Sequence, residues 1–336
     1  MVTTVNGRFL TQPLTGVQTY AIRFSSYLYE NWEDVQWIVQ HTDHIHITLP
    51  LIQTGRLKGH AWEQISLPIH LKKIGSPLLI NFGNTAPANY SNQLVTIHDL
   101  GFIKHPEGYS TWFTIYYRAL IPVLIRKNKK IITVSETIAN EIQQFYGIKD
   151  HQIEVIYNTA EINTSRLPKE NFILSVGSIQ PRKNYRKMYE IFLHCDEKYR
   201  WVIVGSSHSI FRHDDELLQL LNTHPRIELI ENISDEKLNQ YYAQALLLMT
   251  ASKYEGCNLP VLEAIQHGLP VFISDIPVHR ELYEAHADFF SLDDSPGDIA
   301  KRINQLINSG SSVLPIEKFT IQEQGKKLIS LVAQYN

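Results

Sequence analysis

Short apolar runs recur along this chain, and most are separated from the next by an amphipathic stretch of helical length. The run LVTI at 94–97 stops at His98-Asp99, as a buried strand that ends in a functional loop does. Other runs of this kind are LLIN at 78–81, IITV at 131–134, FILSV at 172–176, WVIV at 201–204, LLLM at 246–249 and PVFI at 270–273. Strands that alternate with helices in this way predict βαβ units and parallel sheets.

Two of the helices have recognisable ends. Ser135 is expected to cap a helix that runs through Gln144 and ends near Gly147. Ser234 is expected to cap another that runs through Ala245. Both helices would start just after a strand.

The chain has 336 residues, which is enough for two domains of ordinary size. The polar stretch at 158–171 has no clear periodicity and separates two sets of strand–helix units. We therefore expect a first domain over residues 1–165 and a second over residues 166–317, with a cleft between them. Ligands of open parallel sheets bind outside the carboxyl ends of the strands, so the residues there are the first candidates for function.

Composition is that of a soluble globular protein, with 43% hydrophobic and 19% charged residues. The formal net charge of -3 gives no overall attraction to nucleic acid, and no nucleic-acid partner is expected. Cys195 and Cys257 are too few for a disulfide framework, which favours the cytoplasm. No run of about 18 apolar residues occurs and the first residues do not resemble a signal peptide, so no membrane-spanning segment is expected.

A pair of cations follows the strand at 172–176. Arg182 and Lys183 lie in the stretch GSIQPRKN, in the loop that leads from strand to helix, where a phosphate group can bind. Taken alone, such a pair is more simply a solvated helix start. No GxGxxG or Walker A pattern is present, so dinucleotide binding is disfavoured.

A pair of carboxylates changes that interpretation. The stretch YEGCNLPVLEA places Glu255 and Glu263 eight residues apart, the first in a loop and the second on the helix that follows. The N–H groups at the start of that helix, near Asn258 and Leu259, can hold an anionic oxygen. Cations, carboxylates and a helix start together favour a site over a solvated surface.

Taken together, SVGSIQPRKN from Ser175, YEGCNLPVLEA from Tyr254 and HGLPVFISD from His267 resemble the donor half of glycosyltransferase family 4. TGVQTY, HDLGF and TVSETIANEI look like acceptor-half signatures of the same family, so the resemblance covers nearly the whole chain. It implies the GT-B fold, an α/β architecture of two doubly wound Rossmann-like domains that face each other across a cleft. It also implies a C-terminal helix within 318–336 that packs back on the first domain.

The activity implied by the resemblance is retaining hexosyl transfer from a UDP- or GDP-sugar. The acceptor would be a hydroxyl of a glycan or lipid-linked glycan, in the assembly of bacterial surface polysaccharide or another glycan. No cofactor is expected, and no metal, because the chain lacks the Asp-x-Asp triplet of metal-dependent GT-A transferases. Two alternatives stay open: a nucleotide-sugar epimerase or phosphorylase of GT-B shape, and a catalytically silent nucleotide-sugar-binding subunit.

Roles for single residues follow from the same resemblance. Glu255 would contact hydroxyls of the donor sugar and Glu263 the ribose, while Arg182 and Lys183 would neutralise the leaving diphosphate. The remaining expected contacts are Gly16 with the phosphates, His98 with the sugar from the acceptor side, Asn258 and Leu259 with the donor at the helix start, and Ile233 with the base.

The chain departs from the common family pattern at three places. Cys257 and Asn258 stand where many members read EGFGLP, which leaves the identity of the sugar open. Asn158-Thr159-Ala160 replaces the usual Asn-Gly, and the C-terminal helix lacks the common Trp. None of the proposed reacting groups is changed.

Two further clusters have simpler explanations. His41, Asp43, His44 and His46 could be imagined as a metal site, but a solvated face is favoured. Aromatic and basic residues alternate from 102 to 130, which a half-buried helix explains. A peripheral contact of the first domain with the inner face of a membrane is the alternative for this stretch.

Overall fold

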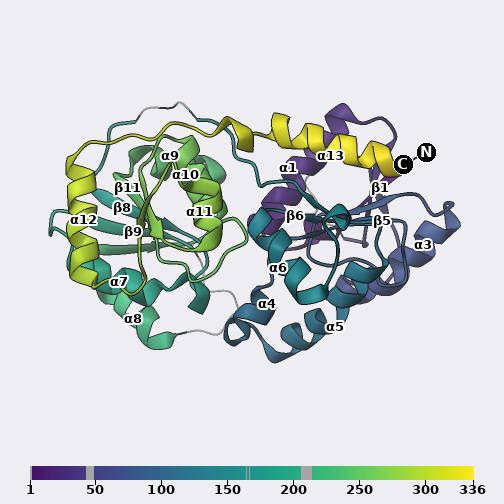
Figure 1. Cartoon of the computed structure of the whole chain (residues 1–336), viewed down its shortest axis with the longest axis horizontal. Helices are drawn as coiled ribbons and strands as arrows, with labels where there is room; N and C mark the ends of the chain where they lie inside the picture. Colours follow the sequence, from purple (N-terminus) through teal and green to yellow (C-terminus); the bar gives the residue numbers. More distant parts are fainter. Residues whose placement is uncertain (1, 43–48, 164, 166, 206–213) are drawn as a thin grey trace. The chain divides into compact units, whose positions relative to one another are not determined.

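The computed structural model describes residues 2–42, 49–163, 165, 167–205 and 214–336, so Asp43, His44 and His46 lie outside the described residues. The chain forms two compact units (Figure 1). Unit 1 comprises Met1–Leu100, Ile115–Thr159 and Lys318–Asn336, and unit 2 comprises Gly101–Thr114 and Ala160–Glu317. Residues 101–114 thus group with unit 2, although they fall within the range expected for the first domain.

A parallel sheet, seven-stranded in the described residues, forms the centre of unit 1 in the order β3-β2-β1-β4-β5-β6-β7. The order reverses between β1 and β4, which is the point where doubly wound sheets bind ligands. The strands are β1 Thr3–Asn6, β2 Val35–Val39, β3 Leu51–Gln53, β4 Leu79–Asn81, β5 Gln93–Ile97, β6 Lys130–Thr133 and β7 Ile153–Val155.

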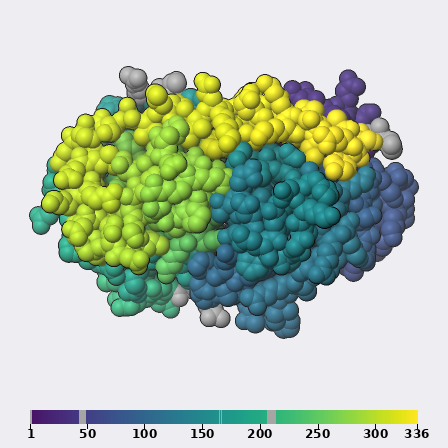
Figure 2. Space-filling view, in the orientation of Figure 1, coloured from purple at the N-terminus to yellow at the C-terminus, as the bar shows by residue number. Residues whose placement is uncertain are grey.

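Helix α13 (Ile321–Tyr335) brings the end of the chain to unit 1, where it packs on α1 (Gly16–Asn31). A Cβ atom on Gly325 would lie 2.4 Å from the ring of Tyr27, so the two helices approach closely. Gln324 accepts a hydrogen bond of 3.1 Å from the backbone N–H of Tyr157. Figure 2 shows the outer side of α13, in yellow, on the surface.

The other helical segments of unit 1 are η1 Gly7–Thr11, α2 Gly59–Ala61, the π-helix η2 Trp62–Ser66, α3 Leu67–Lys73, α5 Thr111–Lys127, which begins in residues of unit 2, α6 Glu136–Tyr146 and η4 Asp150–Gln152.

A second parallel sheet, six-stranded in the described residues, forms the centre of unit 2 in the order β10-β9-β8-β11-β12-β13. Its order reverses between β8 and β11. The strands are β8 Phe172–Val176, β9 Arg200–Val204, β10 Ile227–Ile230, β11 Leu247–Thr250, β12 Val271–Ser274 and β13 Asp288–Phe290. Both sheets therefore carry the strand order of doubly wound α/β folds.

Helices cover the sheet of unit 2 and bury a core around Trp201, Phe192 and Ile303. The helical segments are α4 Gly101–Lys104, η3 Pro106–Gly108, η5 Pro181–Lys183, α7 Tyr185–Leu193, α8 Asp215–Thr223, α9 Asp235–Gln244, α10 Leu259–Gln266, α11 Pro277–Tyr283, α12 Pro296–Asn308 and η6 Glu317–Phe319. Within the described ranges, no helix is long and apolar enough to cross a membrane.

The local predictions of strands and caps are confirmed. Each apolar run singled out in the sequence is a strand in one of the two sheets. Ser135 accepts a hydrogen bond from the N–H of Ile138 at the start of α6, and Gly147 ends that helix with φ 66°. Ser234 accepts from the N–H of Lys237 at the start of α9.

Candidate functional site

Two glycines shape the loop that follows β8. Gly177 has φ 139°, which favours glycine, and a Cβ atom on Gly205 would lie 2.0 Å from the carbonyl oxygen of Gly177. The backbones after β8 and β9 thus approach more closely than side chains would allow. Tyr185 donates a 2.7 Å hydrogen bond to the carbonyl of Gly177, which fixes the loop against α7.

The cations of this loop meet a carboxylate from the loop after β11. Nζ of Lys183 lies 2.6 Å from Oε1 of Glu255, and a guanidinium nitrogen of Arg182 lies 2.6 Å from Oε2. Ser252 donates a further hydrogen bond of 2.7 Å to Oε1. Lys183 is 8% exposed and Glu255 4% exposed, so this pair of cations is not a solvated helix start. The loops come from β8 and β11, between which the strand order reverses.

The charge state of Glu255 follows from these contacts. Burial alone would raise the pKa of the carboxyl group, but the positive charges of Arg182 and Lys183 outweigh burial and lower this pKa to about 2. Glu255 is therefore an anion across the physiological pH range. The three side chains form a largely buried cluster with one excess positive charge, which is suited to an anionic ligand.

A chain of hydrogen bonds orients Lys183 from its other side. Asn258 stands just before α10 with φ 66°, a left-handed conformation that asparagine tolerates better than most residues. Its Oδ1 accepts from Nζ of Lys183 at 3.4 Å, and its Nδ2 lies 3.0 Å from Nε2 of His279. Nδ1 of His279 lies 2.8 Å from the carbonyl oxygen of Ser274 and must donate to it. Nε2 therefore accepts, and the amide of Asn258 is held with its oxygen toward Lys183.

The neutral form of His279 makes this chain possible. Burial lowers the pKa of His279 to about 4, against a smaller opposing effect of the hydrogen bond to Ser274. Sequence patterns did not single out His279 or Ser252. A histidine 24 residues after Glu255 carries no motif, and only the folded sheet brings the two loops together.

Glu263 lies on α10, one helical turn beyond Leu259, where that helix begins. Its Oε2 accepts a 3.0 Å hydrogen bond from the hydroxyl of Tyr242 on α9. Because α10 starts with Leu259, the N-terminal end of its dipole lies next to Asn258 and adds positive potential to the cluster.

Two sequence profiles match the chain. The profile described as Glycosyl transferases group 1 matches residues 158–323, and that described as Glycosyltransferase Family 4 matches residues 77–163. The two matches overlap at residues 158–163 and together span residues 77–323, which is most of the chain. The chain belongs to glycosyltransferase family 4.

Individual relatives agree with this assignment. The O-antigen chain mannosyltransferase RfbU of Salmonella typhimurium is 28% identical to this glycosyltransferase over 321 residues, 87% of this chain and 88% of the relative. The serotype-specific mannosyltransferase WbdA of Escherichia coli is 29% identical over 238 residues, 62% of this chain and 29% of WbdA. The crystal structure of Anabaena HepE in complex with UDP and glucose matches with a TM-score of 0.70 at 14% identity, covering 100% of this chain and 96% of HepE. The chain, with its two doubly wound units, therefore has the GT-B fold.

The remaining expected site residues of this family-4 enzyme lie at strand and helix ends. Gly16 is the exposed first residue of α1, and a Cβ atom there would meet nothing within 4 Å, so the protein itself does not require glycine at this position. Ile233 is half-buried in the loop between β10 and α9.

His98 follows β5 and is 6% exposed. Its Nε2 lies 2.7 Å from the carbonyl oxygen of Phe82 and donates to it, which leaves Nδ1 with the lone pair. Burial lowers the pKa of His98, more than the hydrogen bond to Phe82 raises it. The ring of Tyr20 meets the imidazole edge to face at 4.9 Å. His98 is thus a neutral imidazole in a fixed tautomer.

The segment 101–114 of unit 2 packs beside the cation loop, because η3 lies against η5. The ring of His105 lies 5.6 Å from the ring of Tyr254, the residue before Glu255. The sequence places this segment with the first domain, since it follows the strand at 94–97. The fold instead gives the loop with Glu255 an aromatic neighbour from the first half of the chain.

Proposed function

We propose that this enzyme transfers a mannosyl residue from a UDP- or GDP-linked donor to a hydroxyl of a surface polysaccharide or a lipid-linked glycan, with retention of anomeric configuration. The observation that carries the proposal is the buried cluster of Arg182, Lys183 and Glu255 at the switch point of the second sheet. Two mannosyltransferases among the relatives, one of the O-antigen chain and one serotype-specific, support the choice of sugar and pathway.

The chemistry proposed for the cluster is a front-face displacement. The bond between the anomeric carbon and the diphosphate oxygen breaks, and the acceptor oxygen bonds to the same face of that carbon. The acceptor proton passes to a leaving phosphate oxygen. Arg182 and Lys183 stabilise the negative charge that grows on the diphosphate, while Glu255 accepts hydrogen bonds from donor-sugar hydroxyls.

Two cations and the start of α10 can supply the positive potential that a divalent ion gives in other transferases. We therefore propose catalysis without metal. Glu263 would bind the ribose, Ile233 the base, Gly16 the phosphates through its backbone, and His98 the donor sugar.

The test is a transfer assay with the purified chain. GDP-mannose, UDP-mannose, UDP-glucose and UDP-galactose would first be compared in thermal unfolding, where a ligand at about 100 times its dissociation constant stabilises the fold by about 2.7 kcal/mol. The donor that binds is then incubated, with its sugar labelled, with a lipid-linked glycan extract. We expect GDP- or UDP-mannose to give a product whose first-formed anomer, read by NMR, matches the donor.

Other outcomes separate the alternatives. An inverted anomer would contradict the retaining mechanism. Epimerised donor or released sugar phosphate without acceptor would indicate an epimerase or phosphorylase. Saturable donor binding with no product would indicate a silent binding subunit.

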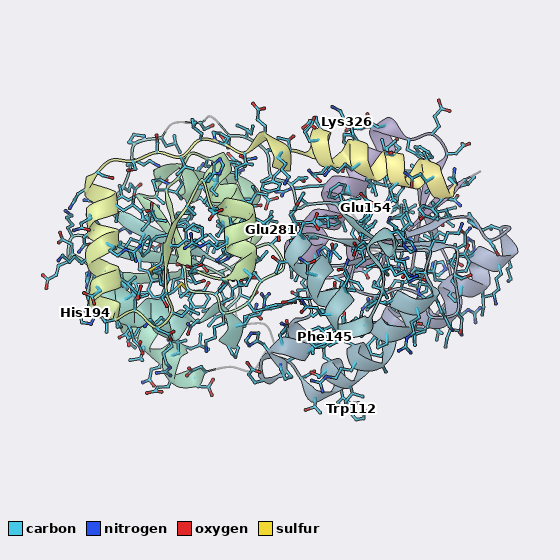
Figure 3. All side chains as sticks on the ribbon, viewed as in Figure 1. Trp112, Phe145, Glu154, His194, Glu281 and Lys326 are labelled. Atoms are coloured by element: carbon cyan, nitrogen blue, oxygen red, sulfur yellow. The ribbon has the colours of Figure 1, made fainter. Side chains whose placement is uncertain are left out.

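We further propose that α5 docks on an anionic membrane surface from the cytoplasmic side. Trp112, labelled in Figure 3, is 82% exposed and Ile115 is 54% exposed. The exposed Arg118 and Arg126 lie on the same helix. An exposed tryptophan with cations nearby suits the interface of anionic lipids. Cysteines that are both free and buried agree with a reducing compartment. The test is co-sedimentation with phosphatidylglycerol vesicles, which Trp112→Ser should weaken; equal binding by Trp112→Ser would contradict the proposal.

A further inference from the structure

A second cluster of buried polar groups lies at the carboxyl edge of the sheet in unit 1. Arg8 follows β1 and Thr85 follows β4, the two strands between which the order of this sheet reverses. His60 and Glu63 follow β3, on α2 and on the π-helix η2. In doubly wound sheets this is the place for a ligand, and π-helical turns are frequent at functional sites.

Glu63 is the centre of this cluster and is 1% exposed. Its Oε1 accepts hydrogen bonds of 2.9 Å from Asn6 and 3.0 Å from the hydroxyl of Thr85. Arg8 donates to the same hydroxyl oxygen at 2.9 Å and to Nε2 of His60 at 3.0 Å. Because the guanidinium can only donate, Nε2 of His60 accepts, and the imidazole proton resides on Nδ1.

The other side of this cluster has unused hydrogen-bonding capacity. Oε2 of Glu63 lies 3.6 Å from Arg8 and 3.5 Å from Nδ1 of His60, both too far for a good hydrogen bond. Among the described residues, Oε2 of Glu63, Nε of Arg8 and Nδ1 of His60 are buried and have no hydrogen-bond partner. Buried unsatisfied groups destabilise a fold, so stability does not explain why three of them occur together.

The neighbours of the cluster suit a sugar ring. The ring of Tyr116 lies 4.4 Å from the ring of His60 and that of Tyr117 lies 6.4 Å from it, both on α5. Tyrosine rings offer an apolar face to the C–H face of a sugar and a hydroxyl to its polar edge. The side chain of His60 is 38% exposed, so the cluster reaches the surface. Asn84, next to Thr85, accepts a 2.7 Å hydrogen bond from the N–H of His98 and so links the cluster to that residue.

We propose that Arg8, His60 and Glu63 bind neighbouring hydroxyls of the terminal sugar of the acceptor glycan. This proposal rests on the proposed function, because it names the site that orients the acceptor. Glu63 accepts a hydrogen bond from one hydroxyl through Oε2, and Arg8 donates through Nε to the adjacent sugar oxygen. The charge of Arg8 is balanced by Glu63 within the cluster, so the site suits an uncharged sugar rather than a phosphate.

The test is saturation-transfer NMR with three probes: methyl α-D-mannopyranoside, methyl α-D-galactopyranoside and methyl N-acetyl-β-D-glucosaminide. We expect the wild-type chain to bind at least one of them. Glu63→Gln should weaken that binding by about 10- to 100-fold, the loss typical of a hydrogen bond to a charged group. His60→Ala should weaken it by about 2- to 10-fold, the loss typical of a hydrogen bond between neutral groups. Glu154→Gln is the matched control, because Glu154 (labelled in Figure 3) lies on β7, has a side chain that is 41% exposed and pairs with Lys130.

Each outcome decides the proposal. Weaker sugar binding in both variants, with nucleotide affinity unchanged, supports it, as does a raised acceptor KM with an unchanged donor KM. Unchanged sugar binding by folded His60→Ala would overturn it, even if Glu63→Gln does not fold. Absence of binding of all three probes to the wild-type chain would overturn it as well. Failure of every nucleotide sugar to bind would instead contradict the proposed function.

Discussion

Replacement of Lys183 by alanine tests the cation cluster in unit 2. Its ammonium lies 2.6 Å from Glu255, and its side chain is 10% exposed. Breaking a buried ion pair costs about 3–5 kcal/mol of unfolding free energy, and we expect about 3 kcal/mol because the ion pair with Arg182 stays in place. Turnover should fall by about 10²–10³-fold, or about 2.7–4 kcal/mol, since the ammonium meets the leaving diphosphate as its charge grows. Donor binding should weaken much less.

Urea unfolding followed by circular dichroism measures the change in unfolding free energy. Release of nucleoside diphosphate from the donor, with and without acceptor, measures turnover. Lys198→Ala is the matched control, because Lys198 forms an exposed ion pair with Asp196 in the same unit. We expect this control to behave as wild type in both assays. A folded Lys183→Ala enzyme with wild-type turnover would refute the diphosphate site, and equal stability would refute the buried ion pair.

Three further predictions concern the same site. Activity should persist in EDTA, as measured by the transfer assay; loss on chelation, restored by Mg²⁺ or Mn²⁺, would contradict catalysis without metal. Glu263→Gln should weaken binding of the free nucleotide in calorimetry, whereas Glu255→Gln should mainly lower turnover; equal nucleotide affinity in wild type and Glu263→Gln would rule out the ribose contact. The pKa of Glu255 is depressed from 4.5 to about 2, so its stabilisation is present above pH 4.5 and is lost as the pH falls toward 2. Over that window the wild type should lose about 3 kcal/mol of unfolding free energy more than Glu255→Gln, and parallel pH profiles would exclude this linkage.

The strands that sequence patterns found are those whose residues are apolar on both faces. FILSV and LLMT are buried in the middle of the second sheet, where neighbouring helices cover both sides. Strand β1 has no such signal, because Thr3, Thr4 and Asn6 are buried with their polar groups bonded inside the protein. Thr4 donates to the carbonyl of Leu78, and Asn6 donates to Glu63. An apolar pattern cannot find a strand whose side chains are satisfied by contacts distant in sequence.

The sequence predicts those residues of the candidate site that lie in recognisable motifs. Arg182, Lys183 and Glu255 lie in recognisable stretches, and the fold brings them within 2.6 Å. His279 does not lie in one, because its role depends on a neutral ring that burial produces. Arg8, a lone cation after an unrecognised strand, gives no pattern either.

The path of the chain has a consequence for biosynthesis. Unit 1 is discontinuous: residues 318–336 belong to it, after the chain has passed through unit 2. Until α13 has left the ribosome, the face of α1 around Tyr27 lacks its cover, and the N–H of Tyr157 lacks Gln324. The unit that begins first is thus completed last, and an unfinished chain would leave this face of α1 exposed to chaperones and proteases.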